Sequence, residues 1–457
     1  MDINFKRGFD IPLKGSAPCQ LDGKIREGTC AVRAIDFRHI TRPKLVVSVG
    51  DTVKAGSPLF FDRVFPKVQH TSPASGEVVE IRRGEKRKLL EVVILMDKET
   101  NFLSFPSFAA EKLSELDRDQ VIDILCRSGL WPHLIQRPFG VMADPETNPD
   151  AIFVSAIDTS PLASDYTFLL DGEKDCFQAG LRILRRLTPG PVHLSISGIP
   201  EKQGFFPEVA KEEKVILHQV TGPHPAGNVG VHIHHIRPIN KGDIVWTLDP
   251  CGLRQIGKLF LKGQYDATKR LSITGPSAAH PTYLETISGI SIKKVVEQQQ
   301  IDPEAVRVIS GNVLTGSAVD AEKGYLGFHH HQITLLPEEN RPEFLGWILP
   351  SFQKLSVHRG VGLFSFLNPN KLREIGTNMH GEARAFVQTG AWEKFLPMDI
   401  LLLYLIKAIL AEDYDEMEAL GIYELIEEDI ALCEFTDVSK QNLQMILREG
   451  IDLMRAD

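Results

Sequence analysis

The chain has 457 residues, of which 43% are hydrophobic and 24% are charged, as in ordinary soluble globular proteins. At about 150 residues per domain, this length predicts roughly three domains. The net charge of −9 and the lack of a long lysine/arginine block argue against a nucleic-acid partner.

The lack of targeting signals and the spacing of the cysteines favour a soluble, cytoplasmic protein. Residues 1–8 alternate charged and apolar side chains without the apolar core of a signal peptide. The longest apolar run, 400–406, is shorter than the roughly 20 residues that a membrane span needs. The six cysteines form no C-x-x-C pair, which excludes the usual zinc-ribbon and iron–sulfur spacings and fits a reducing compartment.

Short β segments at turn spacing are predicted over residues 41–97. The stretches 49–59 and 71–81 each place glycine turns, such as Gly50 and Gly56, beside short alternating runs. Two such halves resemble the biotinyl/lipoyl-type barrel-sandwich domain, in which paired β halves wrap around one small core.

Carrier domains of the barrel-sandwich type display a modifiable lysine at a hairpin tip. Here Lys67 is displaced from that register and Pro66 stiffens the turn, so the domain is predicted to be structural rather than a swinging arm. The densest basic segment, 82–88, is predicted to be a solvated hairpin.

Residues 110–255 alternate helical and strand patterns. The helical segments are 109–128 and 177–187, and the strand candidates are 151–157, 192–196 and 215–220. Such alternation predicts a parallel sheet that is covered on both faces.

Beyond Gly252 the pattern changes to glycine-punctuated strands. Segments 270–275 and 306–311 flank a short helix at 292–299, which predicts a small β-grasp module. Residues 340–390 have an irregular, β-rich pattern. An apolar helix is predicted at 400–410, followed by acidic helical segments at 416–420 and 424–432.

The segment 222–227 is the main ligand-loop candidate. Its prolines fix a turn, and Gly227 allows a close backbone approach to a ligand. In a strand, His232 and His234 would point to the same side, as metal ligands could. No carboxylate or cysteine completes a metal signature nearby, so hydrogen-bonded histidines are favoured there and in the cluster 328–331.

The chain carries no recognisable catalytic motif. G-x-G-x-x-G, Walker A, G-x-S-x-G and H-E-x-x-H are all missing from the sequence. Cys433 is isolated and is expected to be a buried thiol. We therefore predict no catalytic residue and no metal ligand in this chain.

The order of barrel-sandwich, parallel α/β, β-grasp and C-terminal helical segments resembles the NADH-binding flavoprotein subunit of respiratory complex I and the RnfC subunit of ferredoxin–NAD reductases. It is most similar to the NqrA family, the A subunits of Na+-translocating NADH:quinone oxidoreductases. The segments that carry this resemblance are 6–15, 83–87, 128–131, 137–139, 158–163, 222–227, 256–260, 307–311, 325–327, 344–347 and 397–401.

The resemblance predicts a multidomain α/β plus β protein. Residues 1–105 would hold an N-terminal segment and the barrel-sandwich (biotinyl/lipoyl-like) domain, and 106–255 a Rossmann-like α/β domain. Residues 256–336 would form a β-grasp (SLBB) domain. Residues 337–457 would form a β-rich segment and a C-terminal helical domain.

The cofactor sites of the wider group are altered in this sequence. In the complex I relative, a glycine-rich loop after the first helix of the α/β domain cradles the flavin phosphate through backbone N–H groups. At that place this chain has Trp131, Pro132 and Ile135, which would block or remove that backbone. Cys433 alone cannot hold an iron–sulfur cluster. The chain is therefore expected to bind no flavin and no cluster.

The NqrA resemblance implies a peripheral protein on the cytoplasmic side of the cell membrane, in a complex of six subunits. That complex oxidises NADH, reduces ubiquinone and exports Na+, with flavins and an iron–sulfur cluster in the other subunits (B to F). Direct contact with the membrane-embedded B subunit is expected, and ubiquinone contact is a further hypothesis. His224, Gly227 and Arg137 are the candidate residues of a small-molecule pocket in the altered cofactor crevice.

Three alternatives stay open at this point. The chain could be a self-sufficient flavoprotein that binds NADH and FMN, or a carrier modified at Lys67. It could also be a pure assembly scaffold. A flavin absorption band would favour the first alternative, and an added mass on the intact chain would favour the second.

Overall fold

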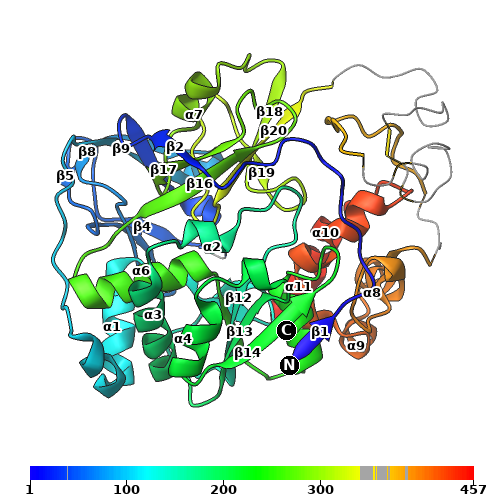
Figure 1. Ribbon diagram of the computed structural model, residues 1–457, viewed down its shortest axis with the longest axis horizontal. Helices are drawn as coiled ribbons and strands as arrows, with labels where there is room; N and C mark the ends of the chain where they lie inside the picture. The colour runs from blue at the N-terminus through cyan, green and yellow to red at the C-terminus, as the bar shows by residue number, and fades with distance from the viewer. Residues whose placement is uncertain are drawn as a thin grey trace.

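The computed structural model describes residues 1–38, 40–339, 354–355, 357, 368, 371–385 and 390–456. Within these residues the strands form four sheets, and in the view of Figure 1 most helices lie at the lower left and at the right, while one helix lies at the top. The predicted β-rich pattern of 340–390 lies largely outside the described residues.

The barrel-sandwich domain is made of two small sheets, in the orders β3-β9-β8-β5 and β4-β6-β7. Phe60, Val78 and Ile94 are fully buried in the single core between them, as predicted. Gly50 and Gly56 both have φ of +92°, which explains the need for glycine in these turns. The strands are β3 (Thr29–Arg33), β4 (Pro43–Leu45), β5 (Thr52–Val53), β6 (Pro58–Asp62), β7 (Gln69–Thr71), β8 (Gly76–Arg83) and β9 (Leu89–Met96).

The predicted hairpin at 82–88 is confirmed, and the structure also places Lys67. The basic segment 82–88 spans the hairpin that joins β8 to β9. Lys67 lies in the turn between β6 and β7, where its side chain is 73% exposed and its Nζ lies 3.6 Å from Glu146 Oε1.

A sheet with the order β1-β14-β13-β12-β15-β10-β11 forms the centre of the α/β domain. The first five strands in this order run parallel, and β10 and β11 are antiparallel additions at one edge. β1 comes from the N-terminal segment and pairs with β14. The strands are β1 (Asp2–Asn4), β10 (Ile135–Arg137), β11 (Val141–Met142), β12 (Ala151–Ala156), β13 (Val192–Ser197), β14 (Ile216–Thr221) and β15 (Val245–Leu248).

Both faces of this sheet are buried, as predicted, because alternate side chains of a strand point to opposite faces. Ile152 and Val154 of β12 belong to a core shared with one group of helices. Phe153, between them, belongs to a second core shared with α5 (Val229–Ile236) and the C-terminal helices. The first group comprises α1 (Arg118–Ser128), α2 (Tyr166–Leu169), α3 (Lys174–Leu187), α4 (Phe206–Glu212) and α6 (Pro250–Lys262).

The helical pattern at 109–128 divides into two elements. Residues Ala110–Glu115 form a 3-10 helix, and Leu116 is extended. Asp117 then begins α1, because its side chain accepts a hydrogen bond from the N–H of Asp119. The single predicted helix is therefore wrong in this respect.

The β-grasp domain has a sheet in the order β19-β18-β20-β16-β17-β2 with α7 (Ile292–Gln299) packed on it. α7 buries Ile292 and Val295 against Leu271, Leu284 and Leu335 of the sheet, which confirms the predicted architecture. β2, again from the N-terminal segment, pairs with β17 at one edge. The strands are β2 (Leu21–Lys24), β16 (Thr268–Thr274), β17 (Thr282–Ile287), β18 (Val306–Ser310), β19 (Ser317–Ala318) and β20 (Gln332–Pro337).

The C-terminal segment consists of α8 (Leu402–Leu410), α9 (Tyr414–Ala419), α10 (Glu427–Thr436) and α11 (Leu443–Ala456). The predicted helices at 400–410, 416–420 and 424–432 are confirmed with shifted ends, and α11 is an addition. Within the described residues, every helix is too short or too polar to cross a bilayer.

The crossing of α3 and α6 generates a test of the packing that positions the start of α6. A Cβ at Gly257 would run into the carbonyl oxygen of Cys176 and would lie 2.7 Å from the backbone N of Gly180. We expect Gly257→Ala to lower the free energy of unfolding by about 1–3 kcal/mol through overpacking, as measured by urea denaturation.

Gly381→Ala is the matched control for this substitution. The nearest atom to a Cβ at Gly381 is a backbone oxygen at 4.0 Å, so the change should stay within about 0.5 kcal/mol. Equal effects of the two substitutions would contradict the tight crossing.

Candidate active-site crevice

The strand order of the central sheet reverses between β12 and β15, and the name crevice is used for the carboxyl edge at this switch point. The chain passes from β12 to β13 and β14 on one side, and then returns to add β15 on the other side of β12. In open α/β sheets, ligands bind outside the carboxyl ends of strands at such a switch point. Asp158 and Thr159 follow β12, and Asp249 follows β15, so these residues mark the two halves of the crevice.

The β12 half is closed by the predicted ligand loop 222–227. The Thr159 hydroxyl lies 3.2 Å from His224 Nδ1 and accepts a hydrogen bond of 2.9 Å from the N–H of Gly227. A Cβ at Gly227 would lie 2.7 Å from the backbone N of Thr159, so this approach requires glycine. The fold thus brings two of the three predicted pocket residues together at Thr159.

His224 is buried and only partly satisfied. Its backbone N–H donates to Asp10 Oδ1 at 2.8 Å, which ties the loop to the N-terminal segment. Its Nε2 is buried without a hydrogen-bond partner. Burial lowers the pKa of His224 to about 4, so the ring is neutral at neutral pH.

Arg137, the third predicted pocket residue, is engaged by the C-terminal segment. Its side chain is 1% exposed, and its Nη1 and Nη2 pair with Asp429 Oδ2 at 2.9 Å and Glu428 Oε1 at 2.8 Å. Both acids lie in the first turn of α10, which also reaches the ligand-loop side because Asn228 Nδ2 donates to Glu428 O. Arg137 therefore reaches the crevice region only through α10.

Both charged partners of the Arg137–Glu428 ion pair have shifted pKa values. Burial raises the pKa of Glu428 to about 7, although Arg137 opposes this shift. For Arg137 the nearby Asp429 and Glu428 outweigh burial and raise its pKa. The guanidinium is therefore charged, and it neutralises the Asp429 carboxylate, which the fold has removed from water, while the Glu428 side chain stays 38% exposed.

Residues 231–235 lie in helix α5, so the strand geometry considered for His232 and His234 does not occur. In a helix, His232 and His234 point in nearly opposite directions and cannot share a metal ion. His232 Nε2 lies 2.7 Å from Ala226 O, and His234 Nδ1 lies 2.7 Å from Glu424 Oε2. The hydrogen-bonded interpretation of these histidines is thus the correct one.

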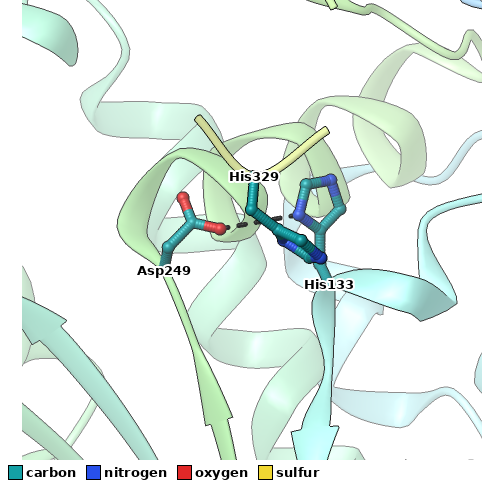
Figure 2. Close-up of side chains that lie close together, drawn as sticks. All are labelled: His133, Asp249 and His329. Atoms are coloured by element: carbon teal, nitrogen blue, oxygen red, sulfur yellow. Dashed lines mark ion pairs between the residues drawn. The ribbon is translucent and has the colours of Figure 1, made fainter. Parts of the chain in front are cut away.

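The β15 half of the crevice contains a cluster that the sequence analysis missed. Figure 2 shows His133, Asp249 and His329, which come from the turn after α1, the start of α6 and the loop before β20. One donor atom of each lies within 4.8 Å of those of the other two. His133 Nδ1 lies 3.5 Å from Asp249 Oδ2.

The first turn of α6 shapes this cluster. Asp249 caps the helix, and its Oδ1 accepts hydrogen bonds from the N–H groups of Cys251 and Gly252. A Cβ at Gly252 would lie 2.7 Å from His133 Nδ1 and 2.9 Å from Asp249 Oδ2. Glycine at this position therefore lets the imidazole approach the carboxylate.

The histidine loop 328–331 is fixed by buried polar contacts. Lys269 Nζ donates to Phe328 O at 3.0 Å and to His330 O at 3.1 Å, and Asp36 accepts from the N–H of Phe328. Burial lowers the pKa of Lys269 to about 8, and Asp249 partly opposes this shift.

The histidines of the loop are neutral at neutral pH. Burial, with the neighbouring His133, lowers the pKa of His329 to about 3. Burial and the nearby Lys269 lower the pKa of His331. Because both imidazole rings stay unprotonated on one nitrogen, each offers a lone pair.

The carboxylates of both halves of the crevice act on the phenol of Tyr166, in α2. Burial raises its pKa well above the ordinary value, and the carboxylates of Asp158 and Asp249 add to this shift. Burial also raises the pKa of Asp158, although hydrogen bonds from Ser160 oppose the change.

The altered cofactor loop has a different arrangement from the predicted plug. The Trp131 ring is buried in the core, where it packs against Trp246 and its Nε1 donates to Ala143 O at 2.7 Å. Pro132 is also buried and has no N–H to offer an anion. The side chain of this turn that faces Asp249 belongs to His133.

Sequence reasoning named His329 only within the cluster 328–331 and missed its pairing with His133 and Asp249, because the three residues are far apart in the chain. One usable signal was the Asp249-Pro250 pair, which combines a helix-capping residue with a proline at the first helical position. A carboxylate there follows a strand and lies at a sheet edge. Cys433, in contrast, is a fully buried thiol as predicted.

Comparison with protein-family models matches three segments of the chain. Residues 3–97 match the "NqrA N-terminal barrel-sandwich hybrid domain", and residues 116–265 match the "NqrA second alpha/beta domain". Residues 271–321 match the "NQRA C-terminal domain". These three domains agree with the sheets described above.

Curated relatives match the chain along nearly its whole length. A protein of Yersinia pestis bv. Antiqua is 37% identical over 450 residues, which covers 98% of each chain. A Vibrio parahaemolyticus protein is 36% identical over 453 residues and 98% of each chain. A Rhodopirellula baltica protein is 36% identical over 98% of this chain and 96% of its own. All three carry the name of the A subunit of a Na(+)-translocating NADH-quinone reductase.

Among solved structures, a chain of an NAD+-reducing [NiFe]-hydrogenase aligns with 51% of this chain and 49% of its own. The TM-score is 0.37 and the sequence identity is 13%. A similarity at this level supports no conclusion.

The buried Arg137 ion pairs generate a stability prediction. We expect Arg137→Ala to lower the free energy of unfolding by about 3–5 kcal/mol, because Asp429 keeps its buried charge without a partner. The double variant Arg137→Ala/Asp429→Asn should lose less unfolding free energy than the sum of the losses of the two single variants. Urea denaturation of the full chain measures all three values.

Arg127→Ala is the matched control for this prediction. Arg127 pairs with Asp123 at 3.2 Å, but both side chains are more than half exposed. Its removal should cost at most about 1 kcal/mol. Similar losses for Arg127→Ala and Arg137→Ala would contradict the structural role of the buried pairs.

The shifted pKa of His224 generates a pH prediction. The pKa is about 4 in the folded chain and 6.5 for an ordinary histidine, so the unfolded chain takes up this proton first. The stability that the folded chain gains from a neutral His224 is complete above pH 6.5, and it is lost as the pH falls toward 4. His224→Gln should therefore show a shallower loss of unfolding free energy over this interval.

Thr159→Val is the comparison variant for the pH prediction, since it removes the hydroxyl beside His224 but keeps the titrating ring. It should retain the wild-type slope even where its absolute stability is lower. Identical slopes for wild type and His224→Gln would contradict the assignment.

Proposed function

The chain belongs to the NqrA family, the A subunits of Na+-translocating NADH-quinone reductases, and we propose that it fills this place in such a complex. In this role it contributes to ubiquinone reduction that is coupled to Na+ export. The observation that carries the proposal is the similarity to members of this family over 98% of the chain.

The proposed place of the chain is peripheral, on the cytoplasmic side of the membrane, in a six-subunit complex. It would contact the other subunits (B to F), with the membrane-embedded B subunit as its direct neighbour. NADH oxidation, the flavins and the iron–sulfur cluster would belong to those other subunits. Two features support this division: Pro132 offers no N–H at the place of the flavin-phosphate loop, and the sequence has no grouped cysteines.

We further propose that the β12 half of the crevice contacts the quinone headgroup. His224 carries a buried Nε2 without a partner, and the neighbouring Gly227 is held against Thr159 by its N–H. A neutral imidazole N–H can donate a hydrogen bond to a quinone carbonyl without a charge being buried. Arg137 would act as a positioning residue, because it holds α10 against this half of the crevice.

Reconstitution tests the proposed function. A tagged form of the chain should copurify with the membrane subunits and restore NADH-driven quinone reduction to a complex from which the NqrA-type subunit has been removed. In the assembled complex, His224→Ala should raise the KM for quinone by roughly 2- to 10-fold, the equivalent of one lost hydrogen bond.

His280→Ala, at an exposed histidine, is the control and should leave the KM for quinone unchanged. Assembly without restored turnover would favour the scaffold alternative. A flavin absorption band in the purified chain would favour the flavoprotein alternative. An unchanged KM for His224→Ala would place the quinone contact elsewhere.

A further inference from the structure

We propose that His133, Asp249 and His329 bind one divalent transition-metal ion that joins the α/β domain to the β-grasp domain. This inference does not depend on the reductase function, and it departs from the sequence analysis, which predicted no metal ligand. It rests on the donor atoms, their spacing, and the contacts that already hold them in place.

The donor set and its spacing suit such an ion. Two imidazoles and one carboxylate form the ligand set of many zinc and non-haem iron sites that keep further positions open. Two ligands at about 2.1 Å from a tetrahedral ion lie roughly 3.4 Å apart. His133 Nδ1 and Asp249 Oδ2 are 3.5 Å apart, and one donor atom of each of the three residues lies within 4.8 Å of those of the other two.

The protonation of His133 leaves a lone pair that lacks a partner. Its Nε2 lies 2.8 Å from Gln255 Oε1, so this nitrogen carries the proton and Nδ1 carries the lone pair. Nδ1 is buried, the residue is 5% exposed, and no hydrogen bond satisfies it. It faces a carboxylate oxygen, and two acceptors that face each other repel unless a cation lies between them.

The surroundings of His133 match those of metal-binding histidines. Such residues donate their second ring N–H to a neighbouring oxygen, which fixes the tautomer and the orientation of the ring, as Gln255 does here. Asp249 is oriented in a similar way, because its Oδ1 accepts two backbone N–H groups and its Oδ2 points toward His133.

The third ligand comes from a loop that is already held in place. Lys269 and Asp36 fix the backbone on either side of His329, and Ser272 donates from its N–H to His331 O at 3.0 Å. The Lys269 ammonium and the N-terminus of α6 both oppose a cation here. The expected affinity is therefore micromolar, weaker than that of a site made of several cysteines.

Cobalt and zinc titrations of the full chain test this proposal. After removal of metals with EDTA, Co2+ should give visible d–d absorption that saturates at one equivalent, and Zn2+ should displace it. Zn2+ should also raise the midpoint of thermal unfolding, because it binds only the folded chain.

Variants of the ligands make the site assignment testable. His133→Ala and Asp249→Asn should each weaken Co2+ binding at least roughly 10- to 100-fold. Asparagine keeps the helix cap, so the second variant retains the fold. His329→Ala/His331→Ala should have the same effect and excludes replacement by His331, whose Nε2 lies 3.4 Å from Asp249 Oδ1.

Gly252→Ala and His280→Ala complete the design. The first keeps every ligand but places a methyl group against His133 Nδ1, and it should weaken binding; the second should bind as wild type does. Circular dichroism checks that each variant is folded.

In the competing arrangement, the Gln255 amide is reversed and a proton on His133 Nδ1 replaces the metal. Failure of wild type to bind Co2+, or equal binding by the folded ligand variants, would overturn the proposal.

Discussion

The parallel sheet of the α/β domain has to be buried on both faces, and the rest of the structure depends on how this is achieved. Helices from the same domain cover one face of β12. The other face is covered by α5 and by helices from the far end of the chain. Arg137 fastens this second layer, because its guanidinium pairs with two carboxylates of α10 inside the protein. The C-terminal segment is therefore part of the α/β core.

The same two-sided packing builds the crevice. On the β12 side, the N-terminal segment reaches the ligand loop through Asp10, and α10 approaches the loop through Asn228. On the β15 side, the β-grasp loop brings His329 to Asp249. Parts from each end of the chain and from two domains thus converge on one sheet edge, where helix N-termini and strand ends leave polar groups to be satisfied.

The turn after α1 illustrates how a site can change its chemistry while keeping its place in the fold. The glycine-rich loop expected in flavin-binding relatives is replaced by a short turn that sends Trp131 into the core. The next residues are Pro132, which removes an N–H, and His133, which faces the crevice. At this turn the structure has an imidazole 3.5 Å from a carboxylate.

The local helices and strands and the family could be predicted from the amino-acid sequence. The short, nearly continuous apolar run at 151–157 and the helical period at 177–187 predicted β12 and α3, because these patterns reflect burial on both faces of a strand and on one face of a helix. The turn at 222–227 was likewise readable, since proline and glycine restrict or widen the backbone locally.

Which elements contact one another depends on the tertiary fold and was not readable from the local patterns. Residues 229–236 form a helix that shares a core with Phe153 of β12, a contact that no local pattern contained. His133, Asp249 and His329 form one cluster, although the first and the last are 196 positions apart in the chain. Local propensity acts over a few residues, whereas a site at a sheet edge is assembled by chain topology, and that explains why its members could not be paired from the sequence.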